Sequence, residues 1–335
     1  MSHGHDGLPR GTFAAIDDRD DDAVDLLSLA SGKKVRRLVP ARLGRLGVAG
    51  VSLLRPGMLL VTYTTGPECT SGVAGCGPKP ETCGAELAEV RIATGQLKIL
   101  WRLGRNRLLS DAVASPNGHS IAALTSPCVP SYFNDHLVVR RLNDGRLWSI
   151  GAHLPRCHAL GRPSWTDHGR RLLVPYAPAR GHHPYRGADG TCPAFGALHL
   201  MELPAFHGQP DLAGTLVPLP RNCEPDSVST GGGRTFVTGD CGGHRLLHDT
   251  AKLIELSLHG RPRVWRIGRC PDGTDVSVTR SGQVLLSAYL FCNPPLAGHR
   301  PRTERSVLDR LSSHGLHQIA VVPNWGNLVW DGLVW

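Results

Sequence analysis

The sequence predicts an all-β fold, a six-bladed β-propeller with four-stranded blades and an incomplete first blade, and two series of glycines are the basis for it. The first series, at turns between short apolar runs, is Gly11, Gly57, Gly118, Gly169, Gly233 and Gly282. The second series is Gly32, Gly95, Gly145, Gly208, Gly260 and Gly326. Because the two series interleave, each unit of roughly 50–65 residues holds two hairpins. Four strands per unit, repeated radially, are typical of a propeller.

The units follow one another with expected breaks near residues 45, 107, 157, 222 and 271. Hairpins are expected in "DAVASPNGHSIAALTS", "PSWTDHGRRLLVPY", "DSVSTGGGRTFVTG" and "DVSVTRSGQVLLSAY". Longer insertions are expected at 66–84, 179–195 and 293–314. Tryptophans recur in the outer strand of four units, which predicts packing between blades; they are Trp101, Trp148, Trp265 and Trp330.

Unit one supplies a second strand at 12–16, a third at 23–27 and a fourth at 35–39, but no first strand. Residues 1–10 are polar and broken by glycine and proline, and "NLVWDGLVW" at 327–335 is interpreted as the last strand of unit six. We therefore expect residues 1–11 to be a disordered or truncated N-terminal segment and residues 12–335 to form one propeller domain. An upstream segment would carry the missing strand, and seven blades would also need upstream sequence. The alternative is that the C-terminal tail closes the ring.

Composition argues against nucleic acid as a partner. The formal net charge is +9, but aromatic residues make up only 5% of the chain and the arginines are spread over all units. A nucleic-acid surface would need the arginines on one face together with aromatics that stack on bases. The interpretation is a solvated basic surface.

Ten cysteines, an even number, favour disulfides over a metal, because no C-x-x-C pair exists. Cys223 is expected to pair with Cys241, and Cys270 with Cys292, since each pair joins the start of a first strand to the end of a second. Cys157 would pair with Cys192 or with Cys128, and the remainder would hold the loop that contains Cys69, Cys76 and Cys83. Disulfides imply an extracytoplasmic or secreted protein, although "MSHGHDGLPRGTF" has no apolar run of a signal peptide. An export signal is therefore expected upstream of Met1, and the alternative is a cytoplasmic protein. No transmembrane segment is expected, because the longest apolar stretch, 48–61, is interrupted by Arg55, Pro56 and Gly57.

The segments "ASPNGHSIAALTSP" and "SWTDHGRRLLVPY" resemble the strand–turn–strand repeat of TolB-like and WD40-like β-propellers. The chain as a whole is similar to the Cys-bearing TolB-like propellers of exported actinobacterial proteins. The resemblance implies the fold over 12–335. It implies no catalytic residue.

Three carboxylates share one register position, because Asp111, Asp226 and Asp275 each precede a turn glycine by the same spacing. Arg162 and Gly50 occupy this position in two other units. The position opens the innermost strand, so the carboxylates are expected at one mouth of the central channel, where Ca²⁺ or a cationic ligand would suit them. The alternative is that each aspartate accepts hydrogen bonds from its own turn.

No reaction motif is present: the sequence has no H-E-x-x-H, G-x-S-x-G or P-loop. We therefore expect a non-enzymatic, monomeric binding or scaffold module that takes a protein, glycan or small-molecule ligand through its rim loops or channel mouth, without a cofactor. The alternative is a hydrolase or lyase that uses channel-mouth residues, with His158 as its candidate histidine and a divalent cation as its cofactor.

Overall fold

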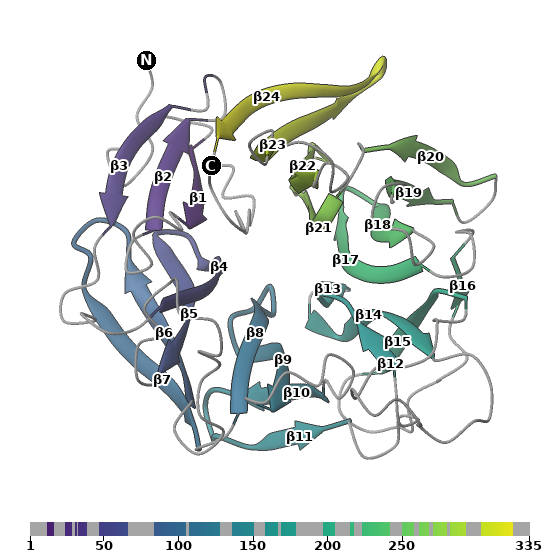
Figure 1. Ribbon diagram of the computed structural model, residues 1–335. Coiled ribbons are helices and arrows are strands. Elements are labelled where there is room, and N and C mark those ends of the chain that lie inside the picture. The colour runs from purple at the N-terminus through teal and green to yellow at the C-terminus, as the bar shows by residue number, and fades with distance from the viewer. Residues whose placement is uncertain are drawn as a thin grey trace, which may run out of the picture.

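The structure is a computed structural model of the chain. It describes residues 12–16, 24–28, 31, 33–38, 47–65, 84–104, 107–127, 136–150, 158–166, 169–178, 197–204, 215–217, 223–241, 250–257, 261–267, 271–279, 282–292 and 303–323. The described residues form six antiparallel sheets arranged around a ring (Figure 1).

The first sheet contains β1 (Thr12–Ile16), β2 (Val24–Ser28) and β3 (Lys34–Leu38). Blade 2 contains β4 (Gly47–Arg55), β5 (Met58–Thr65), β6 (Gly84–Arg91) and β7 (Leu97–Leu103). Blade 3 contains β8 (Arg107–Ala114), β9 (Ser120–Pro127), β10 (His136–Arg141) and β11 (Leu147–Ser149). Blade 4 contains β12 (His158–Leu160), β13 (Ser164–Thr166), β14 (Arg171–Pro178), β15 (His199–Pro204) and β16 (Thr215–Leu216). Blade 5 contains β17 (Cys223–Gly231), β18 (Arg234–Cys241), β19 (Thr250–Leu256) and β20 (Arg263–Arg266). Blade 6 contains β21 (Pro271–Val278), β22 (Val284–Cys292), β23 (Thr303–Ser312) and β24 (Gly315–Pro323).

The all-β propeller prediction is confirmed, but the expected six blades are not. The described residues give five complete blades and a sheet with only three strands. The reason lies in unit one, where β1 pairs with β2 alone and no strand is described on its inner side. In each complete blade the chain runs as an antiparallel meander from an inner strand to an outer one (Figure 1).

The blade boundaries agree with the prediction because glycine is required at the turns on which the prediction was based. Blades 2 to 6 begin at residues 47, 107, 158, 223 and 271, close to the predicted breaks. The turn glycines at 57, 118, 169, 233 and 282 all have a positive φ, between 75° and 87° for all but Gly118 at 68°. A residue with a β-carbon rarely adopts this conformation, so glycine marks these turns in the sequence.

Two details differ from the prediction. In blade 4 the inner strand is split into β12 and β13, both of which pair with β14, so the sheet has five strands. In blade 6 the third and fourth strands are β23 and β24, joined at Gly315 with φ 117°, not at Gly326. The expected insertion 293–314 therefore contains the whole of β23, and the fourth strand ends at Pro323, before "NLVWDGLVW".

The core lies between neighbouring blades. Trp101 of β7 packs among apolar residues of blades 2 and 3, and the Arg140 guanidinium stacks over its ring at 5.3 Å. Trp148 packs against the core of blades 3 and 4, and Trp265 against that of blades 5 and 6. Inter-blade packing is thus confirmed for three of the recurring tryptophans, while Trp330 lies outside the described residues.

One apolar core joins the first sheet to both of its neighbours. Ala14 and Leu26 of the first sheet share it with Val51 of blade 2 and with Leu285 and Leu308 of blade 6. The three-stranded sheet therefore occupies the gap between blades 2 and 6. Packing on both sides closes the ring.

Gly231 tests how closely blades 5 and 6 approach. A β-carbon at Gly231 would lie 2.4 Å from the carbonyl oxygen of Thr279 and 2.8 Å from that of Val278. We expect Gly231→Ala to lower the free energy of unfolding by about 1–3 kcal/mol, because backbone atoms must move to admit the methyl group. Gly104→Ala is the control, since nothing lies within 4 Å of a β-carbon there. Equal urea midpoints for the two variants would contradict the close approach.

Asp309 is a carboxylate that lies beside the apolar core between blades 5 and 6. It is 8% exposed and lies opposite Leu286, which belongs to that core, and its carboxylate has no hydrogen-bond or ion-pair partner in the described part of the chain. Burial raises the pKa of the Asp309 carboxyl. The folded state then holds the proton more tightly than the unfolded state, so the group costs stability once the pH exceeds its ordinary value of about 3.9.

We therefore expect Asp309→Asn to raise the free energy of unfolding at neutral pH by about 1 kcal/mol, a typical single-residue effect. The gain should shrink as the pH falls through the raised pKa of Asp309 and should be absent below the ordinary carboxyl pKa. Asp144→Asn is the control, because the pKa of this exposed aspartate is lowered by the backbone N–H of Arg146. Urea unfolding across acid and neutral pH is the measurement, and a gain that does not depend on pH would contradict the assignment.

Candidate functional site

The inner strands surround a central channel. A space of about 170 Å³ is lined by residues from five of them, including Leu53 of β4, Val113 of β8, Val228 of β17 and Val276 of β21. Arg162, just before β13, also lines it. Because all five complete blades contribute, this space is a property of the ring and not of a single blade.

A larger pocket opens at one end of this channel. The turns that join the first and second strands of the blades gather there, and we call this end the turn mouth. The pocket has a volume of about 700 Å³. It is lined by Pro116, Asn117, Trp165, Thr166, Thr230, Gly231, Gly232, Gly233, Arg234 and Thr235, which come from blades 3, 4 and 5.

The turns at this mouth touch one another. Asn117 Oδ1 accepts hydrogen bonds from the backbone N–H of His119 at 3.0 Å and from Ser115 Oγ at 2.6 Å, which fixes its side chain. A β-carbon at Gly169 of blade 4 would lie 3.5 Å from Asn117 Nδ2. A β-carbon at Gly282 of blade 6 would lie 3.9 Å from Cα of Gly232. Neighbouring turns thus hold the rim of the pocket in place.

Trp165 separates the pocket from the channel and is fixed on both sides. Its Nε1–H donates to the carbonyl oxygen of Val113 in blade 3 at 3.1 Å. Its own carbonyl oxygen accepts from Thr230 Oγ1 of blade 5 at 3.0 Å. Because Trp165 is only 7% exposed, it forms a rigid part of the wall.

Among the described residues of the pocket lining, Arg234 is the one charged side chain. Its Nε donates to Glu255 Oε1 at 2.7 Å, so a carboxylate balances its charge. Its guanidinium also lies 4.7 Å from the ring centroid of Phe236. The described part of the pocket wall is therefore polar.

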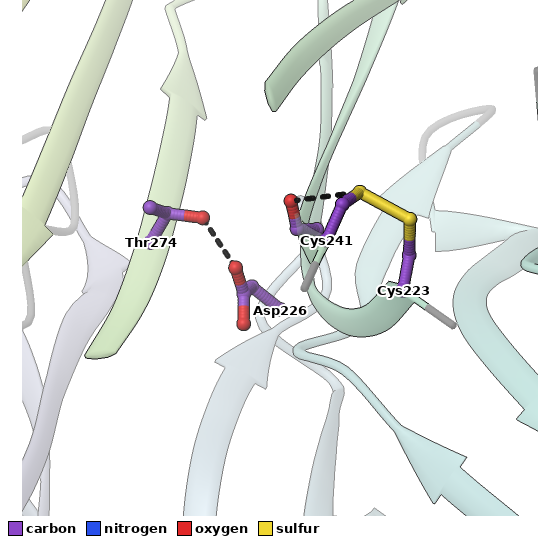
Figure 2. The surroundings of a disulfide bond; sticks show 5 residues. Cys223, Asp226, Cys241 and Thr274 are labelled. Carbon is purple, nitrogen blue, oxygen red and sulfur yellow. Dashed lines mark hydrogen bonds between the residues drawn. A yellow bond between two sulfur atoms is a disulfide. The ribbon is translucent and has the colours of Figure 1, made fainter. Parts of the chain in front are cut away.

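Asp226, one of the three predicted carboxylates, links two blades. It lies at a bulge of β17, where the register shifts between Pro225 and Ser227. Its Oδ2 accepts a hydrogen bond from Thr274 Oγ1 of β21 at 2.5 Å, as Figure 2 shows. The carboxylate thus points to the next blade, whereas the alternative from sequence expected a bond within its own turn.

Asp275 faces a counter-charge that the sequence argument had left out. Arg162 Nη1 lies 3.6 Å from Asp275 Oδ2, and the two side chains are 5% and 17% exposed. The Arg162 backbone is fixed as well: its N–H donates to the Asp226 carbonyl oxygen at 2.6 Å, and its carbonyl oxygen accepts from Val228 N at 3.1 Å. Arg162 therefore ties blade 4 to both blades 5 and 6.

Asp111 lies apart from this group, between blades 2 and 3. Its φ of 53° makes it the one non-glycine residue of the described chain in the left-handed region, where aspartate is tolerated better than most residues. It lies where the register of β8 shifts, between Ser110 and Val113. A β-carbon at Gly50 of β4 would lie 4.0 Å from its backbone nitrogen.

Within the described ranges no group of three or more His, Cys, Asp or Glu side chains has the arrangement of a metal site. The structure brings Asp226 and Asp275 to Arg162, whereas Asp111 lies in blade 3, two blades from Asp226. Calcium or cationic-ligand binding by the three aspartates stays a prediction.

The Cys223–Cys241 disulfide is confirmed, with Cα atoms 4.0 Å apart across the start of β17 and the end of β18 (Figure 2). Cys69, Cys76, Cys83, Cys128, Cys157, Cys192 and Cys270 lie outside the described residues, and Cys292 ends β22 with no side chain described. The other pairings therefore stay predictions. No helix in the described part of the chain is long and apolar enough to cross a membrane.

His158 lies at the opposite end of the blades from the turn mouth. It is 3% exposed, and its ring centroid is 6.2 Å from that of Tyr176. Burial raises the pKa of Tyr176. Burial lowers the pKa of the nearby His136, and the charges of Arg107 and His158 lower it further.

Sequence reasoning missed the pocket residues themselves. It identified Gly233 as a turn glycine, but it did not single out Trp165, Thr230 or Arg234 as lining. The turn glycines were a usable signal, because residues that flank equivalent turns in neighbouring blades must gather at one end of the ring.

Comparison with known proteins identifies no family for this chain. No family model and no curated protein matches the chain. Among solved structures, the chain is similar to prolyl oligopeptidase B from Galerina marginata, with 10% identity, a TM-score of 0.49, and coverage of 97% of this chain and 42% of that one. The chain is also similar to a functionally unknown protein from Desulfotomaculum acetoxidans. The identity is 10%, the TM-score is 0.45, and the match covers 95% of this chain and 98% of that one.

The β-propeller domain of the Trilobed protease from Pyrococcus furiosus gives 9% identity, a TM-score of 0.39, and coverage of 84% of each chain. Against the prolyl endopeptidases and the Porphyromonas gingivalis dipeptidyl peptidase 4, the chain spans 40% and 53% of the length of the matched chains.

Asp226→Asn distinguishes an inter-blade link from a cation ligand. Loss of the charged acceptor for Thr274 should lower the free energy of unfolding by about 1.5–3 kcal/mol, since hydrogen bonds to charged groups are worth that much. If the aspartates bind Ca²⁺, added calcium chloride should raise the melting temperature of the natural chain and leave that of the variant unchanged. If added calcium does not change the melting temperature of the natural chain, the cation prediction is wrong. The hydrogen bond to Thr274 between blades 5 and 6 would then be the role of Asp226.

Proposed function

We propose that this protein is a non-enzymatic binding module whose ligand occupies the turn-mouth pocket. The observation that carries the proposal is the composition of the pocket lining. Its residues come from three blades and include no histidine, cysteine, serine, aspartate or glutamate among the described side chains. A wall without a proton acceptor or an activated nucleophile suits binding better than group transfer.

The lining favours an uncharged ligand rich in hydroxyl groups. Thr166, Thr230 and Thr235 offer hydroxyls that donate and accept, and Asn117 offers an amide whose oxygen is already engaged. The glycines at 231–233 expose peptide groups without side chains. Glu255 balances the charge of Arg234, the one charged side chain that the described lining contains. A neutral carbohydrate segment is the ligand class that matches these groups, since it presents both donors and acceptors.

The wider setting is part of the same proposal. The first sheet would be a sixth blade that lacks its inner strand, and the chain would belong with the TolB-like propellers that its turn segments resemble. The Cys223–Cys241 disulfide supports an exported protein, because such bonds persist in oxidising compartments.

The alternative function is a hydrolase or lyase that uses channel-mouth residues with a divalent cation. A hydrolase or lyase of this kind would need the carboxylates of Asp226 and Asp275. Asp275 is paired with Arg162, and Asp226 accepts a hydrogen bond from Thr274. Both are engaged in holding blades together, so the binding proposal has the stronger support.

Thr166→Trp tests the pocket, because the larger side chain would fill it. An array of neutral oligosaccharides, probed with the labelled chain, should show binding that Thr166→Trp reduces at least tenfold. Val264→Trp is the matched control: Val264 lies on the outer strand β20, is 49% exposed, and is not among the pocket residues. Equal binding by both variants, or no binding of any array member by the natural chain, would overturn the proposal.

A further inference from the structure

Arginines stand beside the turns of several blades, and the fold brings these turns to one end of the ring. In an antiparallel meander of four strands, the turn after the first strand and the turn after the third strand lie at the same end of the sheet. In blade 2, Met58 follows the first of these turns and lies opposite Arg91, which precedes the other. This end is the turn mouth. Arginines that the sequence spreads over all units therefore gather on one face.

Five exposed arginines lie within three residues of such turns and have neither an ion-pair partner nor an aromatic ring contact in the described ranges. They come from blades 2, 4, 5 and 6 and are Arg91, Arg170, Arg261, Arg263 and Arg310. Because no described carboxylate neutralises them, their guanidinium groups can bind an anionic partner.

The carboxylates at this end do not offset these arginines. Each described carboxylate within three residues of a turn already has a cationic partner, except Asp309, which is only 8% exposed. The pairs are Asp25 with Lys34 and Arg37, Glu89 with Arg55 and Lys98, Asp144 with Arg141, Glu202 with Arg171, and Glu255 with Arg234. The described part of the turn mouth therefore carries an excess of positive charge.

The spacing of the arginines indicates a polymer as the partner. They are distributed over four blades, so one small anion cannot contact them all, whereas a long chain with repeated negative charges can.

The aromatic side chains described at this end do not suit a nucleic acid. Trp165 is 7% exposed and Phe236 is fully buried. The guanidinium groups of Arg141 and Arg146 lie over the ring of Trp148 at 5.2 and 5.4 Å. Binding of single strands relies on aromatic rings that are open for stacking on bases. A polysaccharide with carboxylate groups needs no such rings.

We infer that the turn mouth binds an acidic polysaccharide in which uronate groups recur along the chain. An uncharged part of the polymer occupies the pocket, and carboxylates on neighbouring sugars contact the exposed arginines. The choice of a carbohydrate rests on the function proposed for the pocket, whereas the anionic contact rests on the arginines alone.

The binding test presents the full chain with hyaluronan, alginate and polygalacturonate as acidic polymers, dextran as an uncharged polymer, and single-stranded oligothymidine as a nucleic acid. At least one acidic polysaccharide should bind more tightly than dextran and oligothymidine. Its affinity should fall as sodium chloride is added, because salt screens the charges. Arg91→Gln with Arg170→Gln and Arg261→Gln should weaken this binding by roughly tenfold or more, because three charges leave the face.

The matched control removes three cations at the other end of the ring, as Arg107→Gln with Lys252→Gln and Arg266→Gln. Arg107 begins β8, and Lys252 of β19 lies opposite Arg266 of β20. The two variants have the same net charge, so a difference in binding reports the position of the arginines. Equal binding by the two variants, no binding of any acidic polysaccharide, or tighter binding of oligothymidine would each overturn the inference.

The same measurements separate this inference from the function proposed for the pocket. If neutral oligosaccharides bind and Thr166→Trp reduces their binding, but no acidic polysaccharide binds, this inference alone is wrong. If an acidic polysaccharide binds and only the turn-mouth arginine variant loses it, while Thr166→Trp has no effect on any carbohydrate, the pocket proposal is wrong and the anionic contact stands.

Discussion

Hydrogen bonds between the inner strands of successive blades are the interaction on which the rest of this structure depends. Neighbouring blades are separate sheets. In the described ranges they are joined by an isolated backbone bridge between Arg162 and Ser227 and by polar side chains of the inner strands. In blade 5, Ser227 Oγ accepts from Val276 N at 2.9 Å and Ser229 Oγ accepts from Val278 N at 3.0 Å. Trp165 extends the same connection toward blade 3. Each bond is buried or half-buried, so each group left without its partner would carry a desolvation cost.

This connection dictates where side chains must be absent. A β-carbon at Gly161 would lie 2.6 Å from the carbonyl oxygen of Asp226, so Arg162 reaches its two backbone bonds to β17 only because Gly161 has none. The split between β12 and β13 has the same origin, because residues that pair with blade 5 cannot also pair with β14. The polar groups of the inner strands are thus largely occupied by blade contacts. The large pocket lies beyond these contacts, at the turns.

Features that require a particular residue could be predicted from the sequence, whereas contacts that depend on the arrangement of the blades could not. A turn with positive φ requires glycine, so Gly57, Gly118 and Gly233 placed the hairpins and the blade boundaries correctly. The hairpin at Gly315 was missed because Gly326 continued the apparent spacing of the series. The aspartate register was visible, but its meaning was not: that Arg162 faces Asp275, two blades along the ring, follows from the curvature of the inner strands and not from any local pattern. The residues of the pocket wall have no motif of their own.

The distribution of these contacts has a consequence for function. Blades 3 to 6 are tied by the polar bonds of Trp165, Arg162, Asp226 and the two serines. The first sheet shares the apolar core around Ala14 and Leu26 with both of its neighbours, and Arg36 Nη2 donates to the Ala93 carbonyl oxygen of blade 2 at 3.0 Å. The described lining of the turn-mouth pocket comes from blades 3, 4 and 5. The geometry of this lining is therefore set by blades that polar bonds hold to one another, so a ligand there would meet a wall that is fixed before it binds.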